Sequence, residues 1–171
     1  MGALLKLQAR LGLNGALIGA CLLQLVSASH ATTTTSTFTV QATIIASCTI
    51  NSASTLNFGS IGVLTAAVNQ TSTLQVQCTN TTPYNIGLDV GTGTGATVAV
   101  RKMTSGANTV NYSLYSDSGH TVVWGTTVGT NTVAATGNGA AQSYTVYGQV
   151  PAQTTPAPAT YTDTITVTVT Y

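Results

Sequence analysis

The eight residues that decide the fold are Thr164-Ile165-Thr166-Val167-Thr168-Val169-Thr170-Tyr171. Apolar and hydroxyl side chains alternate without interruption, so an extended strand would carry every threonine on one face and every large apolar side chain on the other. Threonine and valine are stiff at χ1 and fit well on a pleated surface. This segment therefore predicts a β-strand with one buried face.

The same period of two continues through the chain from Thr32 onward. The alternating apolar positions are Leu74, Val76 and Cys78, then Tyr84, Ile86, Leu88 and Val90, then Val110, Tyr112 and Leu114, and finally Tyr144 and Val146. Glycine-containing turns separate these runs at 91–95, 105–106, 117–119 and 137–139. Short strands at such spacing, without a helical stripe, predict an all-β sandwich or barrel. We expect the stretches 32–36 and 151–159 to be irregular.

Residues 1–31 have the pattern of a secretory signal peptide. Lys6 and Arg10 precede a largely apolar run over 11–26, and Ser29 and Ala31 fit the small-x-small cleavage pattern. The run is shorter than the roughly 20 apolar residues of a membrane-spanning helix. We expect cleavage after Ala31 and export of a single domain of common size, with a retained anchor as the alternative.

Charge is scarce, at 4% of residues, whereas 43% of residues are hydrophobic. Beyond the signal, the charged side chains are Arg101, Lys102, Asp89, Asp117 and Asp163. One adjacent pair of cations cannot displace the counterions of a nucleic acid, so we exclude a nucleic-acid partner. A hydrated but uncharged surface suits an extracellular structural protein.

Two cysteines, Cys48 and Cys78, remain after the signal is removed, because Cys21 lies inside it. An even pair in an exported chain predicts one disulfide. No Cys/His spacing fits a zinc site, so we expect neither metal nor cofactor.

Catalytic groups are nearly absent. His120 follows Asp117 by three residues, but neighbouring loop residues such as Ser116, Ser118, Asp117 and His120 seldom converge as a triad, so a solvated turn is expected. The glycines of 91–95 precede no helix and indicate a turn, not a phosphate loop. We therefore expect that the protein is not an enzyme.

A second alternating segment lies near the start of the mature chain, with Phe38, Val40, Ala42 and Ile44 on one face. Neither this run nor the final one contains Lys, Arg or Pro, the residues that normally protect an exposed strand edge. We expect the two runs to pair, either within one molecule or between molecules.

Ten short motifs follow one another in order along the chain. They are Phe38-Thr-Val-Gln-Ala-Thr-Ile44, Cys48-Thr-Ile50, Leu56-Asn-Phe-Gly59, Leu74-Gln-Val-Gln-Cys-Thr79, Pro83-Tyr-Asn-Ile-Gly-Leu-Asp89, Arg101-Lys-Met103, Tyr112-Ser-Leu-Tyr-Ser-Asp117, Trp124-Gly125, Tyr144-Thr-Val-Tyr-Gly-Gln-Val-Pro151 and Tyr161-Thr-Asp-Thr-Ile-Thr-Val-Thr-Val-Thr-Tyr171. With these motifs the chain resembles the spore coat protein U family, whose members include subunits of archaic (Csu-type) chaperone–usher pili.

The resemblance implies an incomplete immunoglobulin-like β-sandwich completed by a donor strand from a neighbouring subunit. Residues 32–46 would be the donor-strand extension and residues 47–171 the pilin domain. The implied donor side chains are Phe38, Val40, Ala42 and Ile44, and the implied acceptor groove contains Ile165, Val167, Val169 and Tyr171.

The implied partners are identical or related pilus subunits, a periplasmic chaperone and an outer-membrane usher, without stable membrane insertion. The resemblance further implies export through the periplasm to the cell surface, with roles in adhesion and biofilm formation. A stalk or adaptor position is expected, because the chain has no room for an added receptor domain.

Three alternatives remain open at this point. Residues 37–45 would be an ordinary first strand if the sandwich were complete. A small outer-membrane β-barrel would also end in an alternating strand, although 6% aromatic residues are few for its aromatic girdles. A secreted carbohydrate-binding sandwich would use exposed Trp124, Tyr115 and Tyr147 to stack on sugars.

Overall fold

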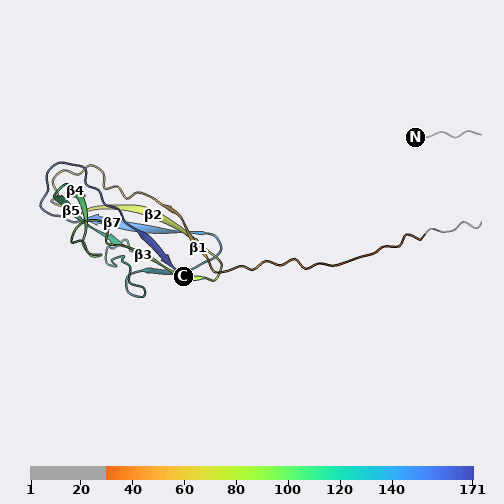
Figure 1. The fold of residues 1–171 in the computed structure, drawn as a ribbon. Helices are drawn as coiled ribbons and strands as arrows, with labels where there is room; N and C mark the ends of the chain where they lie inside the picture. Colours follow the sequence, from red (N-terminus) through yellow and green to blue (C-terminus); the bar gives the residue numbers. More distant parts are fainter. Residues whose placement is uncertain (1–29) are drawn as a thin grey trace, which may run out of the picture. The chain divides into compact units, whose positions relative to one another are not determined.

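The structure is a computed structural model that describes residues 30–171 (Figure 1). The expected signal peptide, residues 1–31, lies outside this range except for its last two residues. Residues 42–171 form one compact unit, and the described residues before Ala42 belong to a separate unit. No strand is present in residues 30–47.

Eight strands build the compact unit. They are β1 (Cys48–Ala53), β2 (Val68–Cys78), β3 (Pro83–Leu88), β4 (Arg101–Ser105), β5 (Asn108–Tyr115), β6 (Val133–Thr136), β7 (Ala141–Val150) and β8 (Val167–Thr170). One sheet has the order β1-β2-β7-β5-β4 and the other the order β6-β3-β8. Every neighbouring pair is antiparallel, which confirms the expectation of an all-β fold with two sheets.

Two of the predicted turns have the backbone geometry that their glycines permit. Gly106 has φ 58° in the two-residue loop between β4 and β5, where Ser105 pairs with Asn108. A positive φ at the first loop position matches the right-handed twist of the two strands. Gly139, with φ 81°, occupies the predicted turn between β6 and β7.

The core contains the residues that the alternating pattern predicts, including Leu74, Val76, Ile86, Leu88, Val110, Tyr112, Leu114 and Val146. Trp124 is also buried, at 1% exposure, and its indole donates a 2.8 Å hydrogen bond to the carbonyl of Ile86. A buried Trp124 cannot stack on a sugar at the surface, as the sugar-binding alternative would require. Val90 differs as well, because β3 ends at Leu88 and leaves Val90 exposed.

Arg101 is buried among backbone carbonyls. Its guanidinium donates to the carbonyl oxygens of Leu88, Asp89, Val98 and Trp124 at 2.7–3.0 Å. Burial lowers its pKa below the ordinary value, but every contact it makes is with an acceptor. The side chain therefore ties the end of β3 to two loops.

The final strand is shorter than its sequence pattern predicts. β8 covers only Val167–Thr170, because carboxylate side chains accept two backbone N–H groups in the residues before it. Asp163 accepts the N–H of Thr164 at 2.8 Å, and Asp89 accepts the N–H of Thr166 at 2.9 Å. Regular pairing with β3 consequently begins only after Thr166.

Candidate functional site

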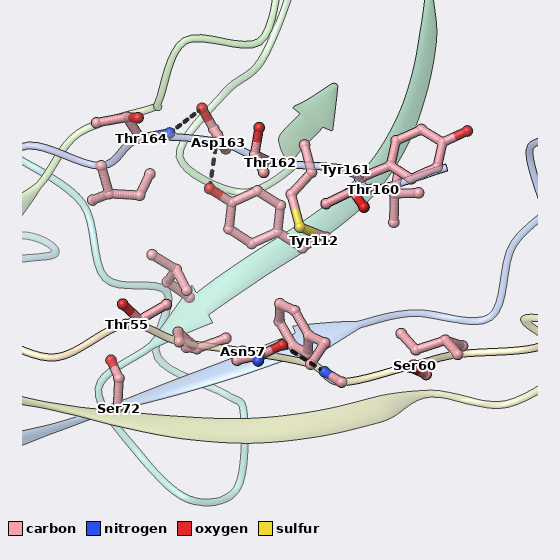
Figure 2. A pocket seen from close by; sticks show the side chains of 18 of the residues that line it. Thr55, Asn57, Ser60, Ser72, Tyr112, Thr160, Tyr161, Thr162, Asp163 and Thr164 are labelled. Atoms are coloured by element: carbon pink, nitrogen blue, oxygen red, sulfur yellow. Dashed lines mark hydrogen bonds between the residues drawn. The ribbon is translucent and has the colours of Figure 1, made fainter. Parts of the chain in front are cut away.

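A cavity of about 1040 Å³ opens between two chain segments that lead away from the sheets. One wall is formed by residues 53–64, which follow β1, and the other by residues 155–165, which precede β8 (Figure 2). The floor is apolar and comes from both sheets, with Leu74, Leu88, Tyr112, Leu114 and Val146. We call this cavity the groove.

The first wall lies directly on the backbone of β7. Ser54 still pairs with Thr73 at 2.9 Å, after which the chain leaves β2. Leu56 and Phe58 then pack on the core. A Cβ at Gly148 of β7 would lie 2.6 Å from the Cδ1 atom of Leu56, so any larger residue at this position would displace the Leu56 side chain.

The second wall closes one end of the groove. The N–H of Gln153 donates to the carbonyl of Leu64 at 3.0 Å, and the N–H of Leu64 donates to the hydroxyl of Thr155 at 2.9 Å. Pro156 and Pro158 follow and have no N–H with which to pair. The irregular course predicted for residues 151–159 is confirmed.

The backbone of β8 is paired on one side only. The N–H of Asp89 donates to the carbonyl of Thr166. In an antiparallel pair of strands, every second residue directs its N–H and C=O groups toward the partner strand, so Thr168 and Thr170 direct theirs toward β3. The N–H and C=O groups of Val167 and Val169 face the opposite way. Within residues 30–171 no strand pairs with that edge, since β8 ends the order β6-β3-β8.

Asp163 is the one charged side chain among the described residues that line the groove. The carboxylate of Asp163 accepts the hydroxyl of Tyr112 at 2.7 Å (Figure 2). It also accepts the N–H of Thr92 at 2.7 Å. Burial, with the bond to Asp163, raises the pKa of Tyr112 far above its ordinary value. The phenol therefore stays protonated and donates.

The expected acceptor residues occupy different parts of this arrangement. Ile165 and Val167 line the groove. Val169 is half-buried against the core further along β8, and Tyr171 is 60% exposed. The structure thus brings two of the four residues, Ile165 and Val167, into the lining of the groove.

The expected donor side chains lie in the segment without strand structure. Phe38, Val40 and Ile44 are 87%, 84% and 83% exposed, and Ala42 is exposed too. They make no strand pairing within the described chain. A first strand that completes the sandwich internally, one of the three alternatives, is not present.

Sequence reasoning missed the wall 53–64 and the floor residue Tyr112 as parts of a site. The alternation of Leu56 and Phe58 was an available signal, because both side chains turn to the core. The sequence pattern could not show that the two walls, residues 53–64 and residues 155–165, lie opposite each other. The groove joins segments that are far apart in the sequence, and a local pattern does not report such contacts.

The other predicted features have clear outcomes. Cys48 and Cys78 form the expected disulfide. Asp117 accepts the backbone N–H groups of Thr121 and Val122, and the ring of His120 packs edge-on against Tyr115, at 5.2 Å between centroids. Asp117 is therefore a turn-capping residue.

The described residues contain neither a candidate metal centre nor a candidate membrane-spanning helix. Residues 30–171 hold no group of three or more His, Cys, Asp or Glu side chains that could bind a metal ion. In the same range, no helix is long and apolar enough to span a membrane.

Comparison with known proteins assigns the family. Residues 34–168 match the model of the Spore Coat Protein U domain. The chain belongs to the spore coat protein U family. This is a family of structural proteins, so the expectation that the chain is not an enzyme is confirmed.

Two relatives agree with this assignment. Protein U of Myxococcus xanthus is 33% identical over 160 residues, covering 85% of this chain and 89% of Protein U. The chain described here also matches a chain of the CsuC–CsuE chaperone–tip adhesion subunit pre-assembly complex, from archaic chaperone–usher Csu pili of Acinetobacter baumannii. That match has 27% identity and a TM-score of 0.56 and covers 75% of this chain but 40% of the other.

The chain therefore has the fold of a Csu pilin-like sandwich. Because it spans less than half of the matched Csu chain, the likeness concerns the shared sandwich only.

Proposed function

We propose that this protein is a structural subunit of a surface pilus, assembled by the chaperone–usher pathway through donor-strand exchange. The observation that carries the proposal is the unpaired edge of β8 beside an open apolar groove. Backbone groups at such an edge need partners, and an unprotected edge recruits strands from other chains. Strand addition supplies both hydrogen bonds and apolar side chains.

The donor in this proposal is the segment containing Phe38, Val40, Ala42 and Ile44. These side chains alternate along the chain as a groove-filling strand requires, and they are exposed in the single chain. Burial of Phe38, Val40 and Ile44 would contribute about 1.5–3 kcal/mol each, and Ala42 less. On the acceptor side we assign Ile165 and Val167 to the groove, with Val169 further along β8 and Tyr171 directly after its end.

The organisation of the chain follows from this assignment. Residues 1–31 would be the cleaved signal, residues 32–46 the donor extension and residues 47–171 the pilin domain. A periplasmic chaperone would occupy the groove first, as the chaperone–tip subunit complex of the Csu relative suggests. An outer-membrane usher and further copies of the subunit complete the set of partners.

The cellular role proposed is adhesion and biofilm formation at the cell surface. Hydroxyl and amide side chains dominate the polar residues, with 4% charged residues in the chain, which suits a fibre outside the cell. A stalk or adaptor position fits a single sandwich.

Deletion of residues 32–45 tests the donor assignment. The shortened subunit should still be recovered with its chaperone, because the groove is intact, but it should not polymerise, because it has no strand to donate. Negative-stain electron microscopy of cells carrying the variant alone should find no fibres. Fibres built from the deletion variant would contradict the proposal.

A matched pair of substitutions controls for effects on export. Val40→Asp places a charge on the groove-facing side of the donor strand, whereas Gln41→Asp places the same charge on the opposite side. We expect Val40→Asp to abolish fibres and Gln41→Asp to retain them at similar subunit levels in the periplasm.

A further inference from the structure

The segment before β8 changes sheets within a few residues. Thr162 pairs with Thr104 of β4, with hydrogen bonds of 2.8 and 3.2 Å in the two directions. Thr166 then pairs with Asp89 at the end of β3. Asp163 lies at this crossing, so its contacts decide the path of the groove wall between the two sheets.

The carboxylate of Asp163 holds the crossing from three directions. One oxygen accepts the N–H and the hydroxyl of Thr92, at 2.7 and 2.8 Å, and the N–H of Thr164 at 2.8 Å. The other oxygen accepts the hydroxyl of Tyr112 at 2.7 Å. The carboxylate sits so close to Gly91, whose φ is 79°, that any side chain there would collide with it.

Tyr112 extends this contact across the groove. Its ring forms part of the floor on β5, and its edge-on neighbour at 6.3 Å between centroids is Phe58, which belongs to the opposite wall. One chain of contacts therefore runs from the wall 155–165 through the floor to the wall 53–64 (Figure 2). The orientation of the Tyr112 ring depends on the carboxylate that its hydroxyl reaches.

We propose that Asp163 is a positioning residue for strand docking, which holds the Tyr112 ring against Phe58 and so sets the spacing of the two groove walls. The inference rests on the proposed function for its consequence, since a correctly spaced groove is what a donor strand needs. Asp163 itself need not touch the donor. A bond to an ionised acceptor is about twice as strong as a neutral one, so the carboxylate is well suited to this task.

The test uses the full chain with V40D and I44D, which disable its own donor segment and leave the groove unchanged. The probe is a fluorescent synthetic peptide with the sequence of residues 37–45, and its binding is followed by anisotropy. Asp163→Asn should weaken binding about tenfold, and Tyr112→Phe by a similar factor. The double variant should be no weaker than Asp163→Asn alone, because both changes act on the same bond between the carboxylate of Asp163 and the hydroxyl of Tyr112.

Asp117→Asn is the matched control, because Asp117 also caps a turn through backbone N–H groups but lies outside the groove lining. It should leave peptide affinity within about twofold. Additive losses at Asp163 and Tyr112, or an equal loss for Asp117→Asn, would overturn the positioning role.

A second measurement does not depend on the peptide. Hydrogen exchange of the amides of residues 55–63, in the opposite wall, should become about tenfold faster in Asp163→Asn and remain unchanged in Asp117→Asn. Unchanged exchange there would refute the inference even if the peptide binds. Failure of the parent chain to bind the peptide, with faster exchange in Asp163→Asn, would count against donor-strand exchange and in favour of the positioning role.

Discussion

Glycine at position 148 determines how closely the first groove wall approaches the sheet. In this structure the Cδ1 atom of Leu56 would lie 2.6 Å from a Cβ at that position. Gly148→Ala should therefore displace the Leu56 side chain from its place against the core and lower the free energy of unfolding by about 1–3 kcal/mol, the usual cost of overpacking. Urea unfolding monitored by circular dichroism measures the difference.

Gly62→Ala provides the comparison within the same wall, because a Cβ at Gly62 meets nothing within 4 Å. That variant should unfold within about 0.5 kcal/mol of the parent. Equal stability of the two variants would show that the approach of Leu56 to β7 is not limited by Gly148.

Among single residues, the apolar ones on strands were predictable from the sequence. Leu74, Val76, Ile86 and Leu114 are buried because alternate side chains of a strand point to the same face of the sheet, and the apolar face packs into the core. Arg101 was not predictable. Its burial depends on carbonyls from β3 and two loops that meet only in the folded chain.

At the scale of the element, Asp89 holds β8 in register with β3. Burial opposes ionisation of its carboxyl, but hydrogen bonds from Thr166 and Gly91 and the charge of Arg101 outweigh it, so the pKa of Asp89 lies below its ordinary value. A depressed pKa in the folded state means that ionised Asp89 stabilises the fold at every pH above the ordinary pKa of the unfolded chain.

This contribution should disappear as the pH falls through the folded-state pKa of Asp89, below the ordinary 3.8. In the Asp89→Asn variant, the free energy of unfolding should be lower at pH 7 and should fall less steeply between pH 5 and pH 2 than in the parent. Thermal unfolding at a series of pH values measures both slopes. Parallel curves for the two proteins would contradict the assigned role.

The existence of most strands could be predicted, but not where the last one begins. The pattern from Thr164 onward alternates without a break, yet β8 begins only at Val167. The carboxylates of Asp163 and Asp89 accept the backbone N–H groups of Thr164 and Thr166, which would otherwise be available to the sheet. The segment with Phe38 and Val40 alternates equally well and forms no strand in the single chain. Periodicity reports which face a strand would bury, whereas a strand also needs a neighbouring edge to pair with.

For the whole molecule, the disulfide joins the first residue of β1 to the last residue of β2. Closing a loop with a sequence separation of 30 restricts the unfolded chain by about 3.5 kcal/mol. Reduction, or the double variant Cys48→Ser with Cys78→Ser, should lower the free energy of unfolding by up to this amount. Denaturant titration with and without reductant tests it, and identical midpoints would contradict it.

The position of this crosslink also bears on how a fibre of such subunits would respond to pulling. A force applied to the donor extension, residues 32–46, reaches the sandwich at Cys48, the first residue of β1. Because β1 is an edge strand, without the disulfide this force would separate it from β2 one residue pair at a time. Through the covalent bridge the force passes straight to β2, which is flanked by β1 and β7. Fibres stretched in an optical trap should therefore lengthen at lower tension once the bridge is reduced.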